Sequence, residues 1–248
     1  MTGTGQEAVT GAPEPPAQAE AVFGDTLPLA RRYADLLATT GISHGLVGPR
    51  EAPRLWPRHL INCAVVEALL PVNERVVDIG SGAGLPGIVL AIVRPDLDVH
   101  LVEPLLRRTT WLENTVEALG LPNVTVHRGR AQDVELTAPV VTARAVASLD
   151  KLVAWAFPLL PAGGRLLALK GEAAAEELRD VSPLLTTLGV TRSEVHVLGH
   201  DGPDDAVRVV EIVRPDDLRP GTARRARTRA GGPAKSTGAA GRPRGKGH

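Results

Sequence analysis

The sequence predicts an α/β domain built on a mostly parallel β-sheet that helices cover on both faces. From Arg75 onward, short runs rich in β-branched residues alternate with helical stretches. These runs are almost continuously apolar, which is typical of parallel strands buried on both sides. The last two runs are joined by a segment too short for a helix, so we expect them to pair as an antiparallel hairpin.

The elements follow from where the hydrophobic periodicity changes along the chain. The predicted strands are 75–80, 98–103, 124–128, 140–144, 165–170, 194–199 and 208–213. The predicted helices of this part are 86–94, 106–119, 150–160 and 173–188.

Two further helices are predicted before the first strand. Apolar residues recur at helical spacing over 26–40, and Gly41 is expected to end that helix. Pro57 suits the first turn of a second helix, which runs to Leu70 and is followed by a proline. The sheet is therefore expected to follow an N-terminal helical extension.

Both ends of the chain have the composition of disordered segments. Residues 1–22 are rich in Pro, Ala and Gly, and residues 214–248 are basic and show no periodicity. We predict a disordered leader, a folded domain with N-terminal helices and a sheet-bearing core, and a disordered tail. Their bounds are 1–22, 23–213 (helices 23–72, core 75–213) and 214–248.

The net charge of zero, from 28 basic and 28 acidic residues, conceals a strong asymmetry. Residues 214–248 hold ten basic residues and two acidic ones, a surplus of eight. The rest of the chain holds 18 basic and 26 acidic residues, a deficit of eight. A mildly acidic body with a basic tail indicates a polyanionic partner.

The composition excludes several classes of protein. Aromatic residues make up only 2%, too few for a protein that stacks many bases on aromatic rows. Cys63 is the single cysteine, which excludes a disulfide framework and a cysteine-based zinc cluster. No basic residue precedes Arg31, and the apolar runs fall far short of the roughly 18 residues of a membrane span. We expect a soluble, cytoplasmic chain, and we attribute its 24 Arg against 4 Lys to a GC-rich genome.

The strongest functional signal is the segment VVDIGSGAGLPG at 76–87, where a strand enters a glycine-rich turn and a helix follows. Glycines allow positive φ angles and close approach of a ligand, and a helix N-terminus offers free N–H groups. The spacing is Gly-x-Gly-x-Gly, whereas the dinucleotide fingerprint is Gly-x-Gly-x-x-Gly. The next strand ends in Glu103, where an acid can accept both hydroxyls of a ribose. Glu103 alone suits a nicotinamide dinucleotide equally well, so the turn decides the ligand.

The turn resembles motif I of Rossmann-like class I S-adenosylmethionine-dependent methyltransferases. A more specific resemblance spans about residues 25–213. The matching segments are WPRHLINC (56–63), VVDIGSGAGLPGIVLAI (76–92), VEPLLRRTTWLE (102–113), GLPNVTVHRGRAQD (120–133), ARAVASLDKLVAW (143–155) and PAGGRLLALKG (161–171). The chain resembles the small-subunit (16S) rRNA guanine-N7 methyltransferases, or methyltransferase G family, first called glucose-inhibited division protein B.

The resemblance implies an enzyme that transfers a methyl group from S-adenosylmethionine to N7 of a guanosine in the 530 loop of 16S rRNA. The implied partner is 16S rRNA or the 30S subunit, and we expect a monomer with neither a membrane nor a metal ion as a partner. The seven histidines show no spacing to cysteine or carboxylates that predicts a metal site.

The resemblance also implies roles for residues in the cofactor site. Asp78 and Gly82 would surround the methionine moiety, and Gly80 and Leu85 would make backbone contacts to the cofactor. Glu103 would hold the ribose, and Arg144 would lie at the junction of cofactor and substrate. The adenine-side contacts would come from Ala131 and Gln132.

Cations near the carboxyl ends of successive strands are the candidates for holding the RNA. Arg130, Arg144 and Lys170 are expected to grip phosphate and guanine O6. Guanine N7 has a lone pair and no proton, so these residues serve binding and placement rather than base catalysis. Arg58 and His59 are expected to contact the substrate or cover the cofactor, with packing at a helix start as the alternative.

Three alternatives remain open at this point. One is a methyltransferase for another RNA or for a small molecule, and another is a nicotinamide-dependent oxidoreductase. The third is an RNA-binding protein with a degenerate cofactor pocket. The absence of an Asn/Asp-Pro-Pro-aromatic motif after the fourth strand argues against methylation of exocyclic amines. Carbon-5 methylation needs a cysteine nucleophile, and Cys63 is better explained as a buried thiol.

Overall fold

In this computed structural model, which describes residues 11–199 and 206–217, seven strands form one sheet in the order β3-β2-β1-β4-β5-β7-β6. Strands β1 to β5 are parallel, and β7 runs antiparallel to both β5 and β6. The strands are β1 Arg75–Ile79, β2 Asp98–Glu103, β3 Val124–Arg128, β4 Val140–Arg144, β5 Arg165–Lys170, β6 Ser193–Leu198 and β7 Val207–Val213. The predicted strands and the terminal hairpin are confirmed to within one residue at each end.

The strand order reverses between β1 and β4, which are sequence-distant but hydrogen-bonded neighbours. In open α/β sheets, ligands bind beyond the carboxyl ends of the strands at such a reversal, because the two following connections diverge there. The segments after β1, β2, β3 and β4 therefore surround the position where a ligand would bind.

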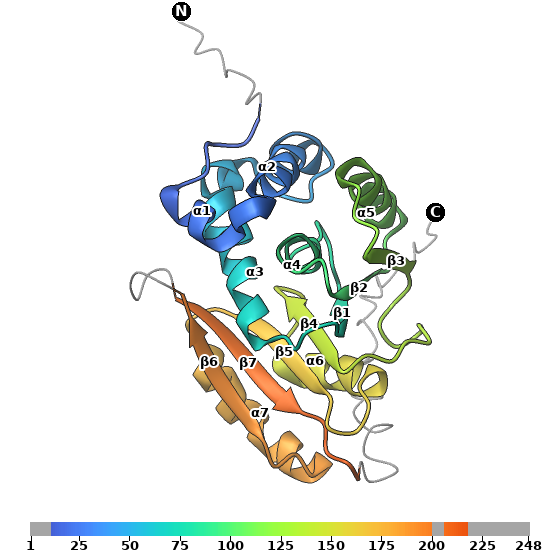
Figure 1. Ribbon diagram of the computed structural model, residues 1–248. Helices are drawn as coiled ribbons and strands as arrows, with labels where there is room; N and C mark the ends of the chain where they lie inside the picture. Colours follow the sequence, from blue (N-terminus) through green and yellow to red (C-terminus); the bar gives the residue numbers. More distant parts are fainter. Residues whose placement is uncertain (1–10, 200–205, 218–248) are drawn as a thin grey trace, which may run out of the picture.

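Helices cover the two faces of the sheet unequally (Figure 1). Helices α4 (Gly87–Val93) and α5 (Leu106–Leu119) lie on one face, with the N-terminal helices packed beside them. Helices α6 (Leu149–Ala156) and α7 (Ala174–Leu188) lie on the other face. A short 3₁₀ turn, η6 (Phe157–Leu159), extends α6. The four helices predicted in this part of the chain are all present.

The N-terminal segment forms a series of short helical pieces that share a core with β1, β2 and α4. The first are α1 Ala17–Phe23, η1 Gly24–Thr26, α2 Leu27–Leu36 and the π-helical η2 Leu37–Gly41. After a turn come η3 Pro49–Arg54, the π-helical η4 Leu55–Ile61, α3 Asn62–Ala64 and η5 Val65–Leu69. Because this layer and the sheet bury the same side chains, the N-terminal helices are part of the fold.

The prediction of a disordered leader over residues 1–22 is wrong for its second half. Residues 17–23 form α1, in which Ala19 is fully buried and Phe23 packs edge-on against Trp56 with ring centroids 6.0 Å apart. The preceding coil is also anchored, because the indole N–H of Trp56 donates to the carbonyl of Pro13 at 2.8 Å. Two buried residues of α1, Ala19 and Phe23, belong to the same core as the other N-terminal helices.

Two predicted helix ends also differ. Gly41 does not end the helix predicted over 26–40, which continues two residues beyond it. Gly41 is buried where a side chain would meet Trp111 of α5. The turn instead comes at Gly45, which has a φ of 66°. The helical series that contains Pro57 begins earlier than predicted, at Pro49. In both cases tertiary contacts outweigh the local signals of glycine and proline.

Parts of three predictions lie outside the described residues: the first ten residues of the leader, the turn 200–205 of the hairpin, and the tail from residue 218. Within 11–199 and 206–217, no helix combines the length and the apolarity that crossing a bilayer requires.

Candidate active site

The turn between β1 and α4 is shaped by glycines that no other residue could replace without strain. Gly80, Gly82 and Gly84 have φ angles of 70°, 57° and 87°, a region that L-residues avoid. At Gly87, a Cβ atom would lie 2.3 Å from the Leu101 side chain, so the start of α4 can approach the sheet only as glycine. The predicted glycine-rich turn is therefore confirmed as a tight passage from strand to helix.

The N-terminal helices hold this turn from outside. The hydroxyl of Tyr33, on α2, donates to the carbonyl of Ala83 at 2.6 Å, and Tyr33 is fully buried. Burial raises the pKa of the Tyr33 hydroxyl well above its ordinary value, so it remains a proton donor. The glycine-rich turn is thus clamped by a segment about fifty residues earlier in the chain.

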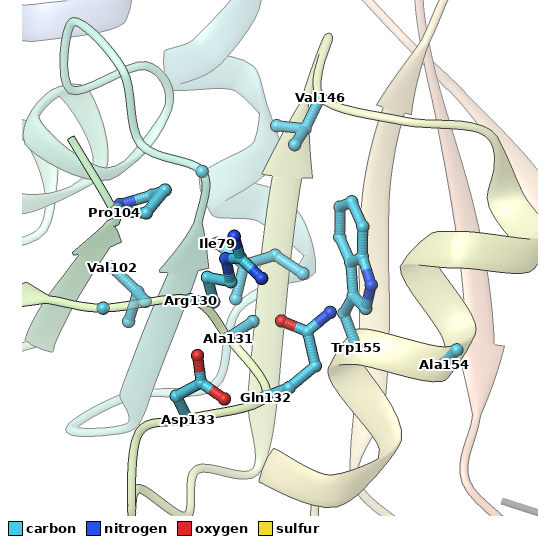
Figure 2. A pocket seen from close by; sticks show the side chains of 12 residues that line it. Ile79, Val102, Pro104, Arg130, Ala131, Gln132, Asp133, Val146, Ala154 and Trp155 are labelled. Atoms are coloured by element: carbon cyan, nitrogen blue, oxygen red, sulfur yellow. The ribbon is translucent and has the colours of Figure 1, made fainter. Parts of the chain in front are cut away.

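A cavity of about 520 Å³ opens at the carboxyl ends of the parallel strands, a size within the roughly 300–1,000 Å³ of small-molecule sites. In Figure 2, the side chains of Arg130, Gln132 and Trp155 surround one space, with Val146 at its edge. The lining residues are Ile79, Gly80, Val102, Pro104, Gly129, Arg130, Ala131, Gln132, Asp133, Val146, Ala154 and Trp155. Four connections that are distant in sequence therefore form one cavity, as their positions after the strands predict.

Asp78, near the end of β1, is a fully buried carboxylate directly below the turn. Its Oδ2 accepts the Gly87 N–H at 3.1 Å, whereas Oδ1 has no hydrogen-bond partner among the described residues. Burial is the main cause that raises the pKa of Asp78 to about 7. A buried carboxylate with a free oxygen suits a ligand that brings positive charge and N–H donors.

Glu103, at the end of β2, is 1% exposed and already serves the protein backbone. One carboxylate oxygen accepts the Gly82 N–H at 3.1 Å, and the other accepts the Leu105 N–H at 3.0 Å. Nη1 of Arg108 lies 3.5 Å from Oε2 of Glu103. Glu103 therefore joins the glycine-rich turn to the segment after β2, and it does not line the cavity in this structure.

Among the other predicted cofactor residues, Gly80, Ala131 and Gln132 line the cavity. Asp78 and Leu85 do not, and the Leu85 N–H is directed to the carbonyl of Ser81 at 3.3 Å. Gly82 also lies outside the lining, because its N–H faces Glu103.

Arg144, the last residue of β4, points toward the N-terminal helices. One guanidinium nitrogen, Nη2, lies 3.0 Å from the carbonyl of Arg58 and 2.7 Å from Nδ1 of His59, and Nη1 lies 3.2 Å from Sγ of Cys63. The structure thus brings Arg58, His59 and Arg144 together. Burial raises the pKa of the fully buried Cys63 thiol, which is held as an acceptor and not as a nucleophile.

The three cations expected to act as a set have separate surroundings. Arg130 is exposed at the cavity, two residues beyond the end of β3. Lys170 ends β5, and its ammonium donates to Glu177 at 2.7 Å and to the carbonyl of Ala147 at 2.8 Å. Any direct grip of Lys170 on RNA would have to break that ion pair.

The sequence analysis did not identify two prominent lining residues, Trp155 and Val146. Trp155 lies on α6, at the end of the matched segment ARAVASLDKLVAW (143–155), to whose residues beyond Arg144 no role was assigned. Val146 follows Ala145, a non-glycine residue with a φ of 53°, and it packs against Gly80 so closely that a Cβ there would lie 2.7 Å away. An aromatic residue on a helix that follows a motif strand was the available signal for Trp155.

Glu194, His196 and Glu211 bring their potential ligand atoms within 4.8 Å of one another at the β6–β7 edge. Two guanidinium groups, from Arg165 and Arg192, approach the same oxygen of Glu211 at 3.6 and 3.5 Å. His196 Nε2 lies 2.6 Å from the other oxygen. Because cations already balance the buried carboxylate, these residues form an ion-pair network, to which we assign no metal.

The fold and the site define a class of protein. A Gly-x-Gly-x-Gly turn lies between β1 and α4, and acids occupy the penultimate position of β1 and the last position of β2. A cavity opens at the strand-order reversal of a sheet that includes the antiparallel β7. These are the features of a Rossmann-like S-adenosylmethionine-dependent methyltransferase, and the unpartnered Oδ1 of Asp78, buried behind the cavity lining, has the charge that suits this cationic cofactor.

The chain belongs to the family described as rRNA small subunit methyltransferase G, whose model matches residues 26–205. A relative from Thermobifida fusca, named ribosomal RNA small subunit methyltransferase G, is 55% identical over 206 residues, covering 82% of this chain and 87% of the relative. A relative of the same name from Streptomyces avermitilis is 53% identical over 203 residues, covering 81% and 85%. The resemblance seen in the sequence motifs is confirmed.

Solved structures show the same fold at much lower identity. A S-adenosylmethionine-dependent methyltransferase from Aquifex aeolicus superposes with a TM-score of 0.51 at 16% identity, covering 69% of this chain and 98% of that protein. P. horikoshii TYW2, solved in complex with MeSAdo, gives a TM-score of 0.50 at 14% identity, covering 62% and 61%. The predicted fold class is confirmed.

Proposed function

We propose that this chain transfers a methyl group from S-adenosylmethionine to N7 of a guanosine in the 530 loop of 16S rRNA. The observation that carries the proposal is the family match over residues 26–205, which contains the whole cavity lining. The same match makes a nicotinamide-dependent oxidoreductase and a non-catalytic RNA-binding protein poor accounts of the site.

The bound cofactor would supply an electrophilic methyl group on a positively charged sulfur. Ala131 and Trp155 offer apolar surface for its adenine, and Gln132 adds an amide. Asp78, which is buried below the turn and outside the cavity lining, would supply negative charge near the amino and sulfonium groups. Glu103 would accept ribose hydroxyls with the lone pairs that the backbone leaves free, after a small movement of the turn that carries Gly82.

The protein's part in the reaction is placement. Guanine N7 carries a lone pair and no proton, so no general base is needed, and Cys63 is too buried to serve as a nucleophile. Arg130 is exposed at the cavity and is the candidate for contacting guanine O6 or a phosphate. Arg58 is the second exposed candidate, while Lys170 is proposed to hold the segment around Ala147.

We propose 16S rRNA, free or within the 30S subunit, as the partner of a monomeric cytoplasmic enzyme that needs no metal ion. The basic segment 214–248 would add nonspecific attraction to phosphates. Recognition of one guanosine would come from the residues around the cavity, since attraction between basic side chains and phosphates does not depend on the base.

The decisive experiment is methyl transfer onto 30S subunits and onto protein-free 16S rRNA from cells that lack this enzyme. Strand cleavage selective for N7-methylguanosine then maps the product. Modification at a single guanosine of the 530 loop is expected. If cells without the protein keep full methylation of that loop, or if the label appears in another RNA, the substrate assignment is wrong.

The substitution Arg144→Ala tests the proposed site. Arg144 joins the end of β4 to the N-terminal helices, so its loss should displace the cofactor–substrate junction and lower kcat at least about a hundredfold. Arg179→Ala, an exposed change on α7, is the matched control and should keep wild-type activity. Equal rates for Arg144→Ala and the wild-type enzyme would remove Arg144 from the site.

A further inference from the structure

His59 connects two charged residues that lie on opposite sides of its imidazole ring. On one side, its Nδ1 lies 2.7 Å from Nη2 of Arg144. On the other, its Nε2 lies 3.0 Å from Oε2 of Glu51, which belongs to η3. The imidazole side chain is only 14% exposed, so water competes little for either contact.

The direction of both hydrogen bonds follows from the chemistry of the partners. A guanidinium group only donates, so Nδ1 of His59 must offer its lone pair to Arg144. The ring proton of the neutral imidazole then resides on Nε2, from which it is donated to the Glu51 carboxylate. Burial and the neighbouring Arg144 both lower the pKa of His59, which keeps the ring neutral.

Glu51 and Arg144 therefore favour the same tautomer of His59, and the Glu51 carboxylate is the group that holds the ring proton on Nε2. If Glu51 offered a donor in place of an acceptor, the ring would favour the other tautomer and point an N–H at the guanidinium of Arg144. Arg58 lies nearby, 3.8 Å from the other oxygen of Glu51, and its pairing helps to hold the carboxylate in place.

The consequence reaches the cavity through the end of β4. Arg144 is followed by Ala145, in a left-handed conformation, and by Val146, which packs against Gly80 and lines the cavity. Anchoring the guanidinium of Arg144 thus fixes the start of the segment that closes one side of the cavity. A loose Arg144 would free this segment.

We propose that Glu51 is a positioning residue for the methyl-transfer site: it selects the tautomer of His59 that accepts from Arg144, and so holds Arg144 and the segment after β4 in place. This inference rests on the proposed function for its activity readout. It extends the site to η3, about ninety residues before Arg144 in the sequence and without any link to the cofactor motifs.

Three substitutions of Glu51 separate this role from a general structural one. Glu51→Gln keeps an acceptor oxygen and should retain kcat within about threefold of the wild-type value. Glu51→Ala removes the acceptor and should lower kcat between about tenfold and a hundredfold. Glu51→Lys replaces the acceptor with a donor and should lower kcat at least as far, with the KM for RNA changing less than kcat. Glu14→Ala is the matched control, because it removes a carboxylate from an exposed ion pair with Arg31 in the same N-terminal region.

A measurement without RNA keeps the inference independent of the substrate. In the ¹⁵N NMR spectrum of the full-length protein, His59 should show the tautomer protonated on Nε2 in the wild-type and Glu51→Gln proteins, and a changed or mixed tautomer in Glu51→Lys. An unchanged His59 signal in all variants would overturn the proposal, as would Glu51→Gln losing as much activity as Glu51→Ala. If the wild-type protein shows the expected tautomer but methylates no rRNA, only the proposed function fails.

Discussion

Asp78 is a buried carboxylate whose ionisation in the folded protein costs free energy. Its pKa is raised from an ordinary value of 3.8 to about 7 because the carboxylate is buried, with Glu103 as an additional repulsive charge. The folded chain therefore binds this proton more tightly than the unfolded chain. As the pH rises from about 4 to about 7, the free energy of unfolding must fall.

We predict that Asp78→Asn removes this pH dependence. The unliganded wild-type protein should lose up to about 4 kcal/mol of stability between pH 4 and pH 8 through this group, whereas the variant should lose markedly less. Urea unfolding of both proteins at pH 4 and pH 8 measures the difference. Parallel losses in the two proteins would show that Asp78 is charged at no cost in the folded state.

Gly80 is the second residue whose identity the site requires. Gly80→Ala should place a Cβ 2.7 Å from a methyl group of Val146, at a φ of 70° that alanine disfavours by roughly 1–2 kcal/mol. We predict a lower melting temperature and weaker binding of S-adenosylhomocysteine by calorimetry.

The contact and the backbone strain can be separated experimentally. Adding Val146→Ala to Gly80→Ala should recover the part of the loss that comes from the clash, but not the part that comes from φ. Gly48→Ala is the control, because a Cβ there meets no described atom within 4 Å. A Gly80→Ala protein with wild-type stability and affinity would show that the segment at Val146 yields freely.

At the scale of elements, the strands were predictable and the N-terminal helices were only partly so. A buried parallel strand is apolar on both faces, and this property alone marks β1, β2, β4 and β5 in the sequence. By contrast, the docking of α1 depends on a tertiary contact, the packing of Phe23 against Trp56, which the local sequence does not reveal. The composition of a segment indicates its tendency to disorder, but it does not report the tertiary contacts that can order the segment.

The same distinction applies to the site. The glycine-rich turn and the strand ends are local signals, and they predicted where Gly80, Ala131 and Gln132 would lie. The pairings of Arg144 with His59 and of Lys170 with Glu177 depend on how separate elements pack. No spacing in the sequence could have revealed these pairings, so three cations that looked alike have three different surroundings.

Helix α1 provides a direct test at this scale. Phe23→Ala should lower the free energy of unfolding by about 3 kcal/mol or more, the usual cost of truncating a buried aromatic residue. Glu20→Ala, an exposed change on the same helix, should alter it by less than about 0.5 kcal/mol. Chemical denaturation measures the free energy of unfolding of both variants. Equal values would mean that α1 does not pack against the domain in solution.

At the scale of the whole molecule, the topology places the start of the basic segment away from the opening of the cavity. Because β7 runs antiparallel to β5, it ends beside Arg165, at the amino end of β5 and away from the carboxyl ends where the cavity opens. The chain beyond Val213 therefore begins at the amino ends of the parallel strands, opposite the carboxyl ends where the cavity opens.

Deleting residues 219–248 should therefore affect affinity and leave chemistry intact. The deletion removes nine basic residues and no acidic ones, so the RNA dissociation constant should rise and depend less steeply on salt, while kcat at saturating RNA is unchanged. The RNA dissociation constants of the two proteins, measured from about 50 to about 300 mM salt, test this. A loss of kcat at saturation would mean that the segment takes part in placing the guanosine.

Trp155 gives the molecule a built-in optical reporter. The chain has three tryptophans, and Trp56 and Trp111 are almost completely buried, at 2% and 4% exposure, with their indole N–H groups bonded within the protein. Trp155 alone among them lines the cavity and remains partly open to solvent. Any ligand that fills the cavity must displace water from this indole, so the intrinsic fluorescence of the unlabelled protein should follow occupancy of the site as it fills.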